Sequence, residues 1–105
     1  MAKKTRNLGV GTLTVLKAVR EGHAYGLEIM AATDQPSCTV YPALGRLEER
    51  GLVTAHWESS ATARKEARPR RRYYRITASG SEELTEAIAR LWALSAPASP
   101  GTAGT

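Results

Sequence analysis

Apolar residues recur at helical spacing in the first half of the chain and alternate with polar ones in a later stretch. Over residues 10–21 they recur every three or four positions, which predicts an amphipathic helix that ends at Gly22. A second apolar stretch predicts a helix that begins near Ala24 and fades over the turn-rich residues 33–36. The chain therefore opens with two short helices joined by a glycine turn.

A third helix is predicted up to Gly51, a typical C-terminal stop. Its apolar face consists of Val40, Leu44 and Leu47. Its start is open between two good N-cap residues, Ser37 and Thr39. A cap at Thr39 places Pro42 where no backbone hydrogen bond is lost, whereas a cap at Ser37 places the proline deeper and removes one bond. We therefore expect the helix to begin near Thr39.

The pattern then changes to two strand-like segments, residues 52–57 and 72–77. In the second segment Tyr74 and Ile76 share one face, because side chains alternate along a strand. The intervening residues 58–69 are polar, basic and small. This pattern predicts an antiparallel hairpin with a long basic tip.

A fourth helix is predicted from a cap at Ser79 or Ser81 to about Leu94. Its apolar stripe consists of Leu84, Ile88, Leu91 and Trp92. We expect Trp57, at the end of the first strand, to pack under this helix. The remaining residues, 96–105, are Ala, Pro, Ser, Gly and Thr, a composition typical of a disordered tail.

The positive charge is concentrated in one segment of the 105-residue chain, whose net charge is +5. Seven of the 15 Lys and Arg residues lie within residues 61–76, where Glu66 is the only acidic residue, so this segment carries +6 (7 − 1) and the rest carries −1 (8 − 9). A concentrated basic segment indicates a polyanionic partner, with nucleic acid ahead of an acidic membrane. The alternative is a solvated basic loop.

Other classes of protein do not fit this sequence. The single cysteine, Cys38, allows no intrachain disulfide and suits a reducing cytoplasm. No apolar run has the length of a membrane span, and the basic residues 1–8 lack the apolar core of a secretion signal. Cys38, His23 and His56 are too few and scattered for a metal site, and no catalytic set is found. We therefore expect no enzyme, no cofactor and no metal.

Three helices, a hairpin and a final helix are the element order of a winged helix-turn-helix, an α+β fold that is mostly helical. In this fold the third helix enters the major groove of DNA and the hairpin, or wing, contacts the backbone or the minor groove. The expected organisation is a flexible basic arm at 1–8, a DNA-binding domain at 9–78, a dimerisation helix at 79–95 and the tail at 96–105.

Several spaced motifs resemble those of the PadR family of transcriptional regulators over roughly residues 8–92. They are YGLEI at 25–29, TVYPAL at 39–44, GLV at 51–53, WE at 57–58 and RRYYRIT at 71–77. The chain departs from the family at Cys38, where glycine is frequent, and at Gly45, where a basic or large residue is commoner. The resemblance implies the short subclass with a single C-terminal helix. It also implies a homodimer that represses a nearby gene and leaves the DNA when a small effector binds.

The candidate site residues fall into three groups. The candidates for DNA contact on the third helix are Ser37, Thr39, Tyr41, Pro42 and Arg46. Those on the wing, as phosphate ligands, are Arg64, Lys65, Arg68, Arg70 and Arg71. Those for the dimer interface are Leu84, Ile88, Leu91 and Trp92. The helix hydroxyls could instead only cap the helix, and Tyr41 could only pack. Trp92 is also a candidate for an effector pocket, and Cys38 is either a redox switch or a buried inert thiol.

The sequence thus predicts a cytoplasmic, homodimeric, sequence-specific repressor that binds an inverted-repeat operator in double-stranded DNA and is relieved by a small molecule. The alternative is a winged-helix interaction module whose basic wing binds an acidic partner protein.

Overall fold

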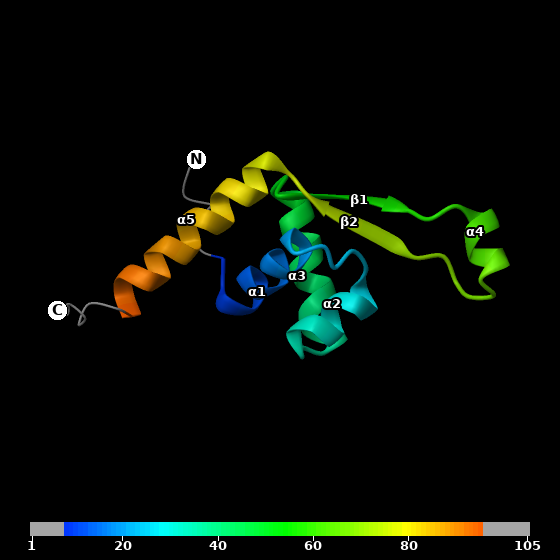
Figure 1. Cartoon of the computed structure of the whole chain (residues 1–105), viewed down its shortest axis with the longest axis horizontal. Coiled ribbons are helices and arrows are strands. Elements are labelled where there is room, and N and C mark those ends of the chain that lie inside the picture. The colour runs from blue at the N-terminus through cyan, green and yellow to red at the C-terminus, as the bar shows by residue number, and fades with distance from the viewer. Residues whose placement is uncertain (1–7, 96–105) are drawn as a thin grey trace.

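The computed structural model describes residues 8–95, which fold into five helices and a two-stranded antiparallel sheet. The helices are α1 (Val10–Arg20), α2 (Gly26–Thr33), α3 (Ser37–Glu49), α4 (Ser60–Lys65) and α5 (Ala78–Ser95), and the strands are β1 (Val53–Trp57) and β2 (Arg72–Ile76). The wing, with α4 at its far end, and α5 extend in opposite directions from the group formed by α1, α2 and α3 (Figure 1). This confirms the predicted winged-helix class. The predicted tail and all but the last residue of the predicted arm lie outside the described residues.

The core lies between α1, α2 and α3 and is closed by the start of the wing and by α5. Its fully buried side chains include Val15, Leu16, Ile29, Val40, Leu44, Leu47, Val53 and Leu84. The apolar face predicted for the third helix is therefore the face that packs. At the end of α3, Gly51 adopts a left-handed conformation (φ 74°), and the N–H of Leu52 donates to the carbonyl of Leu47 (2.9 Å). This turn directs β1 back along the core.

The third helix begins at Ser37, two residues earlier than we predicted. Pro36 occupies the N-cap position without a side-chain cap, and its carbonyl accepts the N–H groups of Thr39 and Val40 (3.0 Å each). Pro42 consequently lies inside the helix and cannot donate to the carbonyl of Cys38. The prediction of a start near Thr39 was wrong because it gave more weight to this one lost bond than to the first turn that Pro36 starts.

The cap of α5 is Thr77, so the predicted caps at Ser79 and Ser81 were wrong. The Thr77 hydroxyl accepts the N–H of Gly80 (2.9 Å). The same hydroxyl lies 2.8 Å from the carbonyl oxygen of Gly51 and 3.1 Å from that of Leu52, to which it can donate. Thr77 therefore fixes the start of α5 against the turn that ends α3.

The hairpin has the predicted alternation. Val53 pairs with Ile76 and Ala55 with Tyr74, and both Tyr74 and Ile76 pack against the core. The outer face of the wing includes the exposed side chain of Arg75. The tip differs from the predicted loop, since it contains the short helix α4.

Candidate nucleic-acid interface

The exposed face of α3 consists of Cys38, Tyr41, Pro42, Gly45, Arg46 and Glu49. Tyr41, Pro42 and Arg46 were predicted to be available for contact, and Ser37 is also exposed. Thr39 is half-buried, and a side-chain carbon added at Gly11 of α1 would lie 3.7 Å from its methyl group. Part of Thr39 therefore faces the protein. Of the two alternatives for Cys38, the buried inert thiol was wrong, because that side chain is exposed.

The ring of Tyr41 lies against a glycine of the neighbouring helix. A β-carbon at Gly26, at the start of α2, would overlap the phenol ring of Tyr41. Tyr41 still exposes 46% of its surface. The glycine therefore lets the ring lie directly on α2 while the rest of the side chain stays exposed to solvent.

The wing tip is a folded unit with its own helix caps. The Ser59 hydroxyl accepts the N–H of Thr62 (3.1 Å) at the start of α4. At the end of α4, Ala67 adopts a left-handed conformation (φ 57°). The N–H of Arg68 then donates to the backbone carbonyl of Ala63 (3.1 Å), a residue whose side chain is buried. These caps place Arg64 and Lys65, both exposed, in the last turn of α4 at the far end of the wing (Figure 1).

Glu58 closes the base of this tip. Its carboxylate is buried and accepts two hydrogen bonds from the Arg68 guanidinium (2.6 and 2.8 Å), one from the N–H of Arg71 (3.2 Å) and one from the hydroxyl of Tyr73 (3.3 Å). The bonds from Arg68 are the main cause that lowers the pKa of Glu58 to about 2. The same pairing raises the pKa of Arg68. We predicted that Arg68 is a phosphate ligand, but in the structure its guanidinium forms an ion pair with the Glu58 carboxylate.

Three other arginines of the wing lie near aromatic rings. Arg70 and Arg72 lie 5.5 and 5.3 Å from the ring centroid of Trp57, and Arg71 lies 3.9 Å from that of Tyr25. Arg70 also donates to the backbone carbonyl of Glu58 (2.9 Å). Trp57 is 53% exposed beside these arginines, so the prediction that it packs under α5 was wrong.

Arg72 has a carboxylate partner, because its guanidinium donates to Glu48 of α3 (3.0 Å). This ion pair ties the second strand of the wing to the last turn of α3. Tyr74, on the same face of β2, has its pKa raised by burial. The base of the wing is therefore attached to α3 through both an ion pair and packed side chains.

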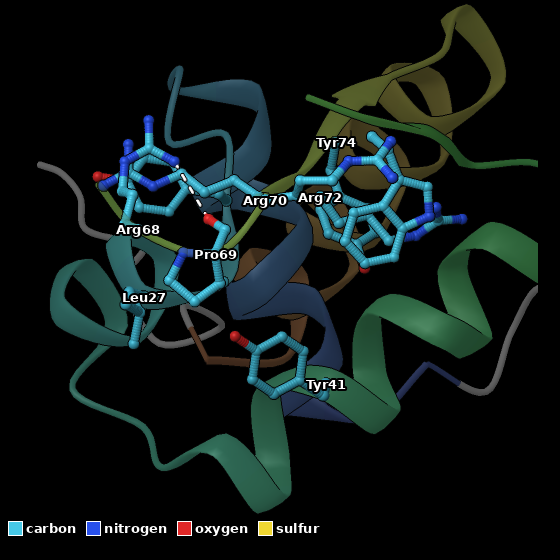
Figure 2. Close-up of a pocket in the computed structure, with 11 residues that line it drawn as sticks. Leu27, Tyr41, Arg68, Pro69, Arg70, Arg72 and Tyr74 are labelled. Carbon is cyan, nitrogen blue, oxygen red and sulfur yellow. Dashed lines mark hydrogen bonds between the residues drawn. The ribbon is translucent and has the colours of Figure 1, made fainter. Parts of the chain in front are cut away.

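A pocket of about 440 Å³ separates the wing from α2 and α3, and we call it the wing pocket. Leu27 and Tyr41 lie on one side of it, with Pro69, Arg70 and Arg72 of the wing opposite them (Figure 2). Trp57, Tyr74 and Tyr25 complete its aromatic lining. The exposed ring on α3 and the basic side chains of the wing thus border one groove.

A family model for PadR-like transcriptional regulators matches residues 15–86. The chain belongs to the PadR-like family. It is therefore a DNA-binding transcriptional regulator and not an enzyme. No protein among the curated sequences matches this chain.

Solved structures resemble this PadR-like chain over most of its length. A PadR family regulator from Eggerthella lenta is 31% identical over 79% of this chain and 72% of that chain, with a TM-score of 0.64. A transcriptional regulator from Clostridium thermocellum is 29% identical over 84% of this chain and 86% of that chain, with a TM-score of 0.62. PadR of Bacillus subtilis in complex with operator DNA is 22% identical over 76% of this chain and 47% of that chain (TM-score 0.64) and shows the shared fold.

In this PadR-like chain the predicted dimer stripe on α5 is divided. Leu84 is 1% exposed and belongs to the chain's own core, so assigning it to the dimer interface was wrong. Ile88 is partly buried against that core, whereas Leu91 and Trp92 are 43% and 66% exposed. The helical spacing of apolar residues revealed the stripe, but it could not show which of these side chains are buried in the chain's own core. None of the helices in the described residues has the length and hydropathy needed to cross a membrane.

Proposed function

We propose that this regulator is a homodimeric repressor that binds an inverted-repeat operator and leaves it when a small effector binds. One observation carries the proposal: Tyr41 of α3 and the basic wing border the same groove. A single DNA duplex can therefore contact both elements at once, as the docking geometry of a winged helix requires. The proposed place of action is the cytoplasm.

The proposed contacts divide between bases and phosphates. Tyr41 on the exposed face of α3 contacts base edges in the major groove, and Pro42 beside it packs against a sugar or a thymine methyl group. Ser37, at the start of the helix, and Arg46 contact phosphates. The proposed phosphate ligands of the wing are Arg64, Lys65, Arg70 and Arg71. Arg68 acts indirectly, because its ion pair with Glu58 fixes the shape of the tip.

The proposed dimer forms through the end of α5. One chain carries one recognition helix, and an inverted repeat has two half-sites, so the DNA-binding unit must contain two chains. Ile88, Leu91 and Trp92 supply the apolar surface that a second copy would cover. Trp92 remains our predicted contact for an effector at that interface.

Fluorescence anisotropy with labelled DNA from upstream of the protein's own gene tests this function. We expect tighter binding to that DNA than to a scrambled duplex of equal length, and weaker binding to both as salt increases. Equal affinity for the two duplexes at every salt concentration would refute a sequence-specific repressor. If the chain then bound an acidic protein instead, the interaction-module alternative would replace it.

A further inference from the structure

Gly45 lies near the middle of the exposed face of α3. Tyr41 and Glu49 come one helical turn before and after it, and Pro42 lies beside it on the same face. Among residues 8–95, apart from its chain neighbours and the backbone of its own helix, no heavy atom lies within 4 Å of a β-carbon added at Gly45. Neither Tyr41 nor Glu49 therefore covers the glycine, and the face has an open notch at its centre.

The chain neighbours of Gly45 do not fill this notch either. The guanidinium of Arg46 donates to the hydroxyl of Thr12 on α1 (3.4 Å). On the other side, the side chain of Leu44 is fully buried in the core. Both neighbours therefore extend away from the notch, and the backbone of α3 is open at this point to a ligand that lies on the exposed face.

Within residues 8–95, packing does not require a glycine at position 45. Glycine is the least favourable residue for a helix after proline, and Gly45 lies inside α3. A small side chain has room there, whereas a β-carbon at Gly26 or Gly80 would overlap its neighbours. What Gly45 supplies is close access to the helix backbone, a use of glycine that is typical where a ligand approaches the chain.

We propose that the notch at Gly45 receives the methyl group of a thymine when α3 lies in the major groove. The notch offers no side chain for a hydrogen bond, and the thymine methyl is the apolar group on the major-groove edges of the bases. The exposed carboxylate of Glu49 on the same face would repel a phosphate, which favours a base edge here. Gly45 is thus a specificity-determining residue. This inference rests on the proposed function, because it requires α3 to read bases.

Replacement of thymine by uracil tests the contact, because uracil lacks only the methyl group. The probe is the selective duplex from upstream of the protein's own gene, with each thymine replaced in turn and binding measured by fluorescence anisotropy. For the unchanged protein, uracil at one thymine of each half-site should weaken binding about fourfold, the effect of losing one buried methyl group.

The Gly45→Ala variant should reverse this preference. Its added carbon occupies the space of the thymine methyl, so the thymine duplex should bind at least about tenfold more weakly than to the unchanged protein. Uracil at the same position should restore binding. A thymine held by Pro42 would instead lose affinity in both proteins alike, so the reversal identifies the base that faces Gly45. Unchanged affinity of Gly45→Ala for the thymine duplex, or a loss that uracil restores at no position, would overturn the inference.

Two further variants serve as controls. Gly9→Ala adds the same methyl group at another exposed glycine whose β-carbon has no close neighbour, and its affinity should stay within about twofold. An equal loss in Gly9→Ala would overturn the inference. Gly45→Lys tests whether the position faces a phosphate instead. Stronger binding to every duplex, with a salt slope steeper by about 1, would show a phosphate contact and overturn the inference as well.

The selectivity of the unchanged protein separates this inference from the proposed function. If it binds the upstream duplex selectively while Gly45→Ala shows the same preference at every thymine, the contact at the notch fails and the proposed function stands. If it binds the upstream and scrambled duplexes equally, the proposed function fails and the contact at the notch fails with it.

Discussion

Alanine at Gly45 and alanine at Gly80 add the same methyl group to two helices, and we predict opposite effects on the free energy of unfolding. Gly45 lies on the exposed face of α3, and an added β-carbon has no heavy atom within 4 Å. Gly45→Ala should therefore gain the helix propensity that glycine lacks, about 1 kcal/mol. At Gly80, in the first turn of α5, the added carbon would overlap the backbone carbonyl of Leu52.

That carbonyl cannot move cheaply, because it also accepts the N–H of Thr77 (3.0 Å). Relieving the overlap costs about 1–3 kcal/mol, as in other overpacked sites. Moving α5 also strains the bond from the N–H of Gly80 to the Thr77 hydroxyl, a cap that contributes about 1 kcal/mol. After subtracting up to about 1 kcal/mol of helix propensity, Gly80→Ala should lose about 1–3 kcal/mol.

Thermal and urea unfolding, followed by circular dichroism, measure both variants against the unchanged protein. At about 4–8 °C per kcal/mol for a domain of this size, Gly45→Ala should raise Tm by several degrees and Gly80→Ala should lower it by more. All samples must be compared at one protein concentration, because association shifts Tm. A Gly80→Ala variant as stable as the unchanged protein, or a destabilised Gly45→Ala variant, would refute the reasoning.

Three further predictions concern the wing and α5. The unchanged protein should be more stable than Glu58→Gln at neutral pH, and the difference should shrink as pH falls from about 4.5 to about 2, because folding lowers the pKa of Glu58; a difference in urea unfolding that does not change with pH would contradict this. Leu91→Arg should convert a dimer into monomers in sedimentation, whereas Glu86→Arg on the same helix should not; a dimeric Leu91→Arg variant would exclude α5 as the main interface. Replacing Arg64 and Lys65 with alanine should weaken binding to all duplexes about equally and reduce the salt slope by about 2; altered preference for one half-site would contradict their assignment to phosphates.

The fold was predictable wherever local pattern and packing agree. The alternation around Tyr74 and Ile76 requires one face of the wing to pack, and the structure packs that face. The face of Val40, Leu44 and Leu47 is likewise buried. The exposed candidates on α3 follow from the same helical periodicity, since the positions opposite a packed face are exposed.

The rest depends on partners that are distant in the sequence. Arg68 is one of seven cations in a basic segment, and nothing local to it shows that Glu58, ten residues earlier, takes its charge. The helix α4 is too short to be stable alone, and its caps and the ion pair beneath it were not visible as a periodic pattern. Trp57 and Leu84 were both assigned from their apolar character. Apolar character predicts that a side chain is buried, but it does not identify the element or chain that buries it.

The hydrogen bond between Glu58 and Arg71 separates the tip of the wing from the strands that carry it. The N–H of Glu58 donates to the carbonyl of Arg71 (2.8 Å), so the chain leaves the hairpin and returns to it at one point. Because the entropy of closing a loop grows only slowly with its length, residues 59–67 can be lengthened, shortened or exchanged without changing the strand register, as long as Arg68 remains to pair with the buried Glu58. How far the protein reaches along a duplex can therefore evolve, or be engineered, independently of the helix that reads the bases.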